Sequence, residues 1–287
     1  MPWQTLRLPD KDAAGTAENA TSTTETQIGT GLTVPDWAHS ITHITFKTIA
    51  LALTTKELIN GYFRITNDKN TIDPLNFPMP QAVCLTGAIG THISPLEITF
   101  PCYHDVDPTD IVRVYFAEDA DLAGLHTHQA YLTFSSEKAP INMKCEKSAV
   151  IAGSATANTR DGAATINTIA DRTKAILGFW NSLMTYPTAA QTFGGYIRVK
   201  SSVLGWLEQI MPTSQLGSGL STQITPLSMP SVMLPKDLLA ECDAVYKRLF
   251  PREFPMKNTR TGFDFENWMD GTNTVAPSGR YGLIYRE

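Results

Sequence analysis

Gly61-Tyr62-Phe63-Arg64-Ile65 and Gly195-Tyr196-Ile197-Arg198-Val199 are two versions of one five-residue pattern, 134 positions apart. Their aromatic and β-branched residues favour a pleated surface. On a strand, successive side chains point to opposite faces, so each arginine lies on the face opposite to its apolar neighbours. We therefore interpret the two segments as one strand that occurs in each of two repeated units.

Shorter matches occur in the same order around these segments, at offsets between 125 and 134 that drift as loop insertions would make them. Together they predict a duplication of roughly 130 residues. The alternative is that two unrelated β domains reuse common turn dipeptides. The matched segments are 36–44 with 161–169, 79–80 with 211–212, Gly87 with Gly219, 93–96 with 224–227, and 100–101 with 234–235.

The rest of the chain is a series of short apolar or alternating runs, broken by Gly, Pro, Asn and Asp. Such a pattern is typical of a sandwich or barrel. We predict an all-β fold of two tandem jelly-roll β-sandwiches with few short helices, the clearest helix at 236–249. The predicted organisation is an extended N-terminal arm at 1–26, jelly rolls at 27–138 and 139–250, and an aromatic C-terminal tail at 251–287 that packs on the second domain or a neighbour.

The composition excludes a disordered chain, because 42% of the 287 residues are hydrophobic. A net charge of −5 gives no global attraction for nucleic acid. The four cysteines form no Cys-x-x-Cys pair, which predicts free, mostly buried thiols. No secretory signal is recognised at the N-terminus, so we expect synthesis in a reducing compartment.

Candidate metal ligands are few. His126 and His128 are two residues apart, so on a strand both rings could reach one metal ion. The pair resembles part of the cupin metal motif, but no acidic residue follows at the required spacing. Asp105 and Asp107, clustered with Asp110, could bind a divalent cation, although Asp beside Pro and Thr is more typical of a turn. We assign no metal site beyond these candidates.

No nucleophile elbow or phosphate-binding loop occurs in the sequence. We therefore predict no catalytic residue, no cofactor and no enzymatic activity. Arg64 and Arg198 occupy matching positions of the repeat, and we expect each to form a structural ion pair with an acid of the other domain or subunit. The acidic turn that begins at Glu118 is expected to be a solvated loop.

With its paired strands, its repeated Met-Pro and Ile-Ser/Thr-Pro-Leu segments and its polar and aromatic ends, the chain resembles the double jelly-roll major capsid proteins of adenoviruses and of tailless, internally membraned phages and archaeal viruses. This resemblance implies homotrimers of pseudo-hexagonal outline that self-assemble into an icosahedral shell. It also implies synthesis in the host cytoplasm and a final location in the virion. The partners implied are other copies and, through the termini, minor capsid or membrane proteins, with no sequence-specific nucleic acid. Trp3, Leu6 and Leu8 could anchor the N-terminus to a membrane or a subunit.

Two alternatives stay open. One is a metal-dependent or sugar-binding protein on a double β-sandwich or bicupin, which the histidine pair would serve. The other is a spike, minor capsid or appendage subunit, which would form a closed trimer or a filament.

Overall fold

A computed structural model shows an all-β chain. It describes residues 2–9, 16–19, 24–52, 57–59, 61–69, 75–79, 82–84, 96–118, 125–149, 160–167, 175–183, 191–201, 208–217, 231–233, 254–255, 262–269 and 279–286. Over these ranges the regular structure consists of strands, and the prediction of an all-β fold built of sandwiches is confirmed. The helix predicted at 236–249 lies outside the described residues. Among the residues that the structure describes, no helix has the length and apolarity needed to cross a membrane.

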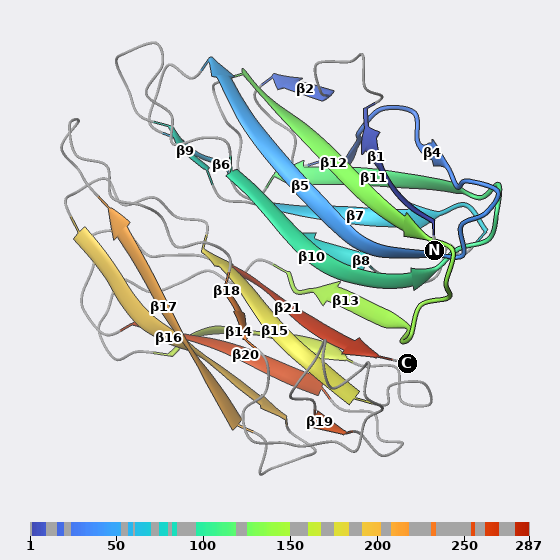
Figure 1. The fold of residues 1–287 in the computed structure, drawn as a ribbon. Coiled ribbons are helices and arrows are strands. Elements are labelled where there is room, and N and C mark those ends of the chain that lie inside the picture. The colour runs from blue at the N-terminus through green and yellow to red at the C-terminus, as the bar shows by residue number, and fades with distance from the viewer. Residues whose placement is uncertain are drawn as a thin grey trace.

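The N-terminal half forms a sandwich of two sheets (Figure 1). The first sheet has the order β1-β12-β5-β10, with β2 also paired to β12; its strands are β1 (Trp3–Leu8), β2 (Thr16–Asn19), β5 (Ser40–Ala52), β10 (Leu96–Asp105) and β12 (Leu125–Ser135). The facing strands run in the order β8-β7-β11-β3, with β4 also paired to β11; they are β3 (Thr26–Gln27), β4 (Leu32–Thr33), β7 (Gly61–Asn67), β8 (Leu75–Pro78) and β11 (Ile111–Glu118). A separate pair joins β6 (Glu57–Ile59) to β9 (Ala82–Cys84).

Alternating side chains fill the space between these sheets. In β11 the pattern of exposure alternates along most of the strand, and Val112, Val114 and Phe116 are buried. Phe46 of β5 stacks on Phe63 of β7, with the ring centroids 4.1 Å apart. Burying each large apolar side chain contributes about 1.5–3 kcal/mol, so this double layer is the main source of stability of the first half.

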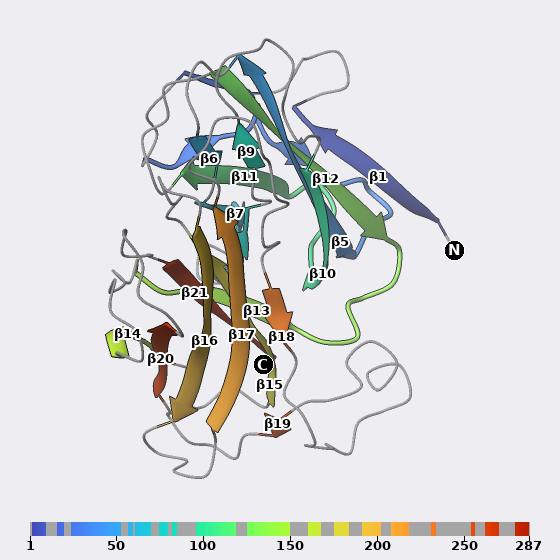
Figure 2. The same ribbon diagram turned by 90° about the vertical axis from the view of Figure 1, so that its left-hand side faces the viewer.

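The C-terminal half forms a second sandwich (Figure 2). One side has the order β18-β15-β21-β13, with β19 also paired to β15; its strands are β13 (Met143–Lys147), β15 (Ala175–Leu183), β18 (Ser231–Met233), β19 (Phe254–Pro255) and β21 (Gly279–Arg286). The other side is a four-stranded sheet of order β14-β20-β16-β17, formed by β14 (Arg160–Asn167), β16 (Gln191–Ser201), β17 (Glu208–Gly217) and β20 (Gly262–Met269).

The two sandwiches share one connectivity. We number eight strands along each half, taking β3 with β4 as one interrupted strand and leaving out β2, β6, β9 and β19. In both halves, strands 1, 8, 3 and 6 then lie side by side in that order, and strands 2, 7, 4 and 5 form the opposite sheet. Eight strands divided in this way between two sheets are typical of a jelly roll.

The repeated five-residue segments occupy equivalent places. Gly61–Ile65 lies in β7 and Gly195–Val199 lies in β16, each the fourth strand of its half. Met79 directly follows the fifth strand of the first half, and Met211 lies in the fifth strand of the second. The match of 36–44 with 161–169 is not equivalent, because the first segment runs into the third strand and the second into the second strand.

A continuous sheet joins the two halves. β13 lies parallel to β8, with Cys145 opposite Leu75, and this pairing extends the sheet across both sandwiches. Cys145 Sγ donates a hydrogen bond to Asn76 O at 2.7 Å. Of the terminal segments, residues 1–26 contribute β1 and β2, while residues 251–287 contribute β20 and β21 between other strands of the second sandwich.

Candidate functional site

The histidine pair lies on β12, which is central in the first sheet. The backbone of His126 is paired with Ala50 of β5 and Glu18 of β2, next to a register shift. His128 is fully buried between the two sheets of the first sandwich. Among the side chains that the structure describes, no three His, Cys, Asp or Glu residues come together as metal ligands.

His128 is held by two side chains of neighbouring strands. Its Nε2 lies 2.8 Å from Glu118 Oε1 on β11, and its Nδ1 lies 3.0 Å from Thr48 Oγ1 on β5. The rings of Phe63 and Phe116 contact the imidazole at centroid distances of 5.6 and 4.2 Å. The imidazole and the carboxylate could exchange a proton, but both side chains are 0% exposed, so no substrate reaches them in this conformation.

Glu118 is the residue that the sequence interpretation missed. We expected a solvated acidic loop to begin there, yet Glu118 ends β11 with its side chain turned into the sandwich. For Glu118 the prediction was wrong, because β11 extends to this residue and its last three residues are all buried. The rest of the predicted acidic turn lies outside the described residues. The buried pair ties the two sheets together, since a buried carboxylate without a partner is costly.

The aspartate cluster forms a turn. Asp105 Oδ1 accepts a hydrogen bond from Ala139 N at 2.7 Å, and Asp107 O accepts one from Asp110 N at 3.1 Å. Asp110 is the buried member, and its carboxylate accepts bonds from Asn67 Nδ2 at 2.9 Å and Asp107 N at 3.2 Å. These contacts assign the three aspartates to local structure.

Lys69 completes the surroundings of Asp110, with its Nζ 2.5 Å from Oδ1. Burial by itself would raise the pKa of Asp110, but the hydrogen bonds from Lys69, Asn67 and Asp107 outweigh burial and hold this pKa below its ordinary value. The same contact raises the pKa of Lys69. The position next to Asp110 that a divalent cation would take is therefore occupied by an ammonium group.

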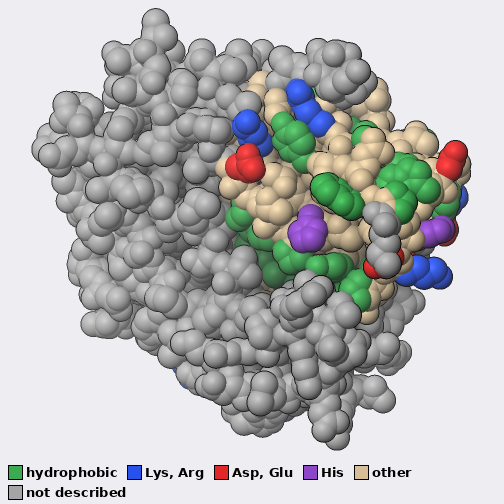
Figure 3. Space-filling model, in the orientation of Figure 1, with side chains coloured by type: hydrophobic (Ala, Val, Ile, Leu, Met, Phe, Trp, Pro, Cys, Tyr) green, Lys and Arg blue, Asp and Glu red, His purple; other side chains and the backbone are tan. Residues whose placement is uncertain are grey.

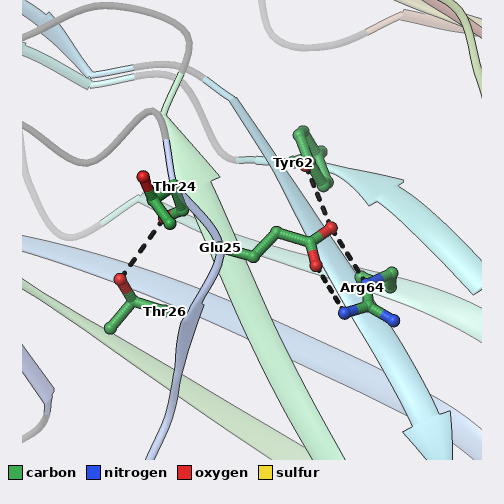
Figure 4. Close-up of polar contacts among 5 residues, drawn as sticks. All are labelled: Thr24, Glu25, Thr26, Tyr62 and Arg64. Carbon is green, nitrogen blue, oxygen red and sulfur yellow. Dashed lines mark hydrogen bonds and ion pairs between the residues drawn. The ribbon is translucent and has the colours of Figure 1, made fainter.

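Arg64 lies on the outer side of β7 and is paired with Glu25, which precedes β3 (Figure 4). Arg64 Nε donates to Glu25 Oε1 at 2.9 Å, Nη2 donates to Oε2, and Tyr62 OH donates to Oε1 at 3.0 Å. The guanidinium also lies over the ring of Tyr115 on β11, 4.7 Å from its centroid. The two-pronged geometry fixes the segment before β3 onto the sheet.

The equivalent arginine of the second half has the equivalent kind of partner. Arg198 Nη1 on β16 lies 3.8 Å from Glu266 Oε2 on β20, and Lys200 Nζ lies 2.6 Å from Oε1 of the same carboxylate. Both repeat arginines form structural ion pairs, but their partners Glu25 and Glu266 belong to the same half as the arginine and not, as we expected, to the other domain or subunit. A structural role explains these contacts without a ligand.

Comparison with known sequences assigns no family. No protein-family model matches the chain, and no curated protein sequence matches it.

Solved structures of similar architecture include capsid proteins and glycosylasparaginases. The chain is similar to the major capsid protein P2 of bacteriophage PM2, with a TM-score of 0.42 and 9% identity over 99% of this chain and 97% of that one. It is also similar to PNGase F, a glycosylasparaginase from Flavobacterium meningosepticum, with a TM-score of 0.46 and 10% identity over 99% and 96% of the two chains. PBCV-1 VP54, a structure fitted into a reconstruction of the virophage Sputnik, gives a TM-score of 0.35 and 8% identity over 99% and 93%.

The group of glycosylasparaginases contradicts our prediction that the chain is not an enzyme. That prediction relied on the absence of short catalytic motifs. Catalytic side chains that come from distant strands leave no such motif in the sequence. The prediction is withdrawn.

Proposed function

We propose that this chain is a structural virion protein, a major capsid protein that self-assembles as pseudo-hexameric trimers into an icosahedral shell. The observation that carries the proposal is the doubled connectivity, in which the two halves repeat the same strand order. Three copies around a threefold axis would present six similar sandwiches, which is the outline that a hexagonal lattice requires.

The junction between the sandwiches supports this proposal. A building block of a lattice must keep its two sandwiches in a fixed relative orientation. The pairing of β13 with β8 gives the chain one sheet across the junction, and Tyr62 of β7 lies 4.1 Å from Lys147 Nζ of β13, measured to its ring centroid. A flexible linker would supply neither contact.

The contacts of the histidine, aspartate and arginine clusters also support the proposal. Each cluster is bound into local structure, and the pair of His128 and Glu118 is closed to solvent. Their contacts stabilise the sandwiches, which is what a shell protein needs of its polar groups.

Electron microscopy and sedimentation of the purified full-length chain test the proposal. Trimers of hexagonal outline, or shells and sheets built of them, are the expected result. A species that stays monomeric at high concentration across salt and pH would contradict it, and a closed trimer or filament without a lattice would instead identify a spike or appendage subunit.

An activity assay separates the structural role from an enzymatic one. The chain is incubated with a glycoprotein carrying asparagine-linked glycans, and the mass of the glycoprotein is followed. Release of the glycan, seen as a loss of mass, would establish an amidase and contradict a purely structural role.

A further inference from the structure

The segment that leads into β3 is fastened to the first sandwich, and we call residues 24–28 the strap. The carboxylate of Glu25 accepts hydrogen bonds from Arg64 Nε at 2.9 Å and from Tyr62 OH at 3.0 Å (Figure 4). Further along the strap, Ile28 is fully buried, and its N–H donates to Val114 O at 2.8 Å. The strap is thus held at two points, a core residue and a carboxylate on the outer side of β7. Figure 3 shows that the face of the molecule in the orientation of Figure 1 carries its own charged side chains, which are separate from these contacts.

Tyr62 also contacts the second sandwich. Lys147 Nζ of β13 lies 4.1 Å from the centroid of the Tyr62 ring, and Arg280 Cζ of β21 lies 5.0 Å from it. A cation over an aromatic ring is attracted by the negative charge of the ring face, and the attraction is larger where water is excluded. Tyr62 is 8% exposed and Arg280 is 9% exposed, so little water reaches their contact. The side chain of Tyr62 therefore joins the strap to two strands of the other sandwich.

Arg280 carries the contact further into the second sandwich. Its Nη1 donates to Ser148 O at 2.7 Å. Ser148 N in turn donates to Tyr281 O at 2.7 Å, and Tyr281 N donates to Ser148 Oγ at 3.0 Å. Tyr281 is fully buried, and its ring stacks on Phe265 with the centroids 5.8 Å apart. A continuous series of contacts thus runs from the strap through Tyr62 to the core of the second sandwich.

The charges make the two sets of contacts of Tyr62 depend on each other. When a phenol O–H donates to a carboxylate, electron density moves toward the oxygen and the ring, which strengthens the attraction of the ring for cations. Glu25 also places a negative charge beside Arg64 and next to the ring that two further cations contact. Loss of Glu25 would therefore weaken the hold of Tyr62 on Lys147 and Arg280.

We propose that Tyr62 couples the strap to the junction between the two sandwiches, so that release of the strap at Glu25 loosens the pairing of β13 with β21. The junction is tight while the strap lies on the sheet and looser when the strap is drawn away. This inference goes beyond the proposed function and does not depend on it, because every contact lies within one chain. Since coupling between two sites is reciprocal, loosening the junction also loosens the strap.

Amide hydrogen exchange of the variant Glu25→Ala tests the coupling in the full-length chain. Exchange is followed by mass spectrometry in peptides that cover 143–148 and 279–286, because local opening sets the exchange rate of bonded amides such as Ser148 N–H. Asp68→Ala is the matched control, since Asp68 is a partly exposed acid that is paired with Arg113 on the outer side of the same sheet. Peptides from β5 and β12 report any general loss of stability, and circular dichroism shows that each variant is folded.

In Glu25→Ala we expect exchange at the junction to be at least about fivefold faster than in the wild type, the lower end of typical coupling between sites. Exchange in β5 and β12 should stay unchanged, and Asp68→Ala should behave like the wild type at the junction. Unchanged exchange at the junction in Glu25→Ala would overturn the inference. An equal rise in β5 and β12, or an equal effect of Asp68→Ala, would overturn it as well.

Two further variants test the path through Tyr62. Tyr62→Phe removes the hydroxyl and keeps the ring, so adding Glu25→Ala to this variant should change exchange at the junction by less than about twofold. Lys147→Met removes the charge and keeps most of the length, so it should speed exchange of the Ile28 amide in the strap. A full effect of Glu25→Ala in the Tyr62→Phe background, or a strap that Lys147→Met leaves unchanged, would overturn the role of Tyr62.

Discussion

At the scale of single residues, the turn that follows β10 is determined by Asp107-Pro108-Thr109-Asp110. Asp110 N donates to Asp107 O, and Thr109 has a φ of 71°. A type II turn requires a positive φ at its third position and commonly has proline at its second. The third position normally takes glycine, so the threonine here is strained.

Thr109→Gly is therefore expected to stabilise the protein. Glycine removes the cost of the left-handed conformation in the folded state, about 1–2 kcal/mol. Part of this gain is lost, because glycine also gives the unfolded chain more conformational freedom. We expect a net gain of up to about 1 kcal/mol in the free energy of unfolding, measured by urea denaturation. Thr99→Gly, at an exposed position of β10 with an extended backbone, is the control and should destabilise. A loss of stability in Thr109→Gly would contradict the strain.

The carboxylate of Asp110 gives a pH-dependent prediction. The pKa of Asp110 is lowered in the folded protein from its ordinary value of 3.8, so the ionised form favours folding. This stabilisation is fully present above the unfolded pKa of 3.8 and is lost as the pH falls through the lower folded-state pKa.

Asp110→Asn should cost about 1–2 kcal/mol at pH 7. Most of this cost comes from the buried hydrogen bonds, because the side chain of Lys69 is 57% exposed and its ion pair is screened by solvent. Urea denaturation of both proteins at pH 7 and near pH 2 checks the expectation that the difference shrinks in acid. An equal difference at both values would show that the charge of Asp110 does not matter.

The residue scale also shows what the sequence could predict. Asp107 and Pro108 are adjacent in the sequence, so the turn could be predicted from these two residues. The partnership of Glu118 with His128 was not, because it depends on how β11 faces β12 across the sandwich. A distant pair of this kind leaves no local pattern.

At the scale of elements, β21 is packed against β15 so closely that a side chain cannot be added. Gly282 is the register partner of Trp180, and a Cβ built on Gly282 would lie 1.8 Å from Cε2 and Nε1 of that indole. Trp180 is fully buried, so its ring has no free space to move into.

Gly282→Ala should lower the free energy of unfolding by about 1–3 kcal/mol. A double-mutant cycle with Trp180→Leu locates the cause, since the smaller side chain vacates the space that the new methyl group needs. We expect the double variant to lose less stability than the sum of the two single variants, measured by urea denaturation. If Gly282→Ala does not fold alone, recovery of soluble, folded protein in the double variant would likewise show that the contact with Trp180 causes the loss of stability. Additive losses would contradict the contact.

The elements themselves were predicted to different degrees. The repeated pattern at Gly61 and Gly195 identified strands in equivalent places, because its alternation is local. The roles of β1 and β21 were harder to predict, since β1 pairs with β12 and β21 lies between β13 and β15. These partners are about a hundred residues or more away along the chain, and composition alone does not reveal them.

At the scale of the whole molecule, the two sandwiches share a core as well as a sheet. Leu177, Trp180 and Ile284 of the second half belong to the same cluster of buried apolar residues as Phe46 and Phe63 of the first. Opening the junction would expose this apolar surface to water. The two halves should therefore unfold together instead of one after the other.

Two buried cysteines report on this coupling. Cys102 lies in β10 of the first half and Cys145 in β13 at the junction, and both are free thiols. Burial raises the pKa of Cys102 to about 12 and raises that of Cys145 as well, so neither is a reactive thiolate at neutral pH.

Labelling with a maleimide in increasing urea, with each site followed by peptide mass spectrometry, measures the urea concentration at which each thiol becomes accessible. We expect one common transition for both cysteines that coincides with loss of the β-sheet signal in circular dichroism. Labelling of Cys145 at a urea concentration that leaves Cys102 protected would show instead that the junction opens before the first sandwich unfolds, and the two sandwiches would then not act as one unit.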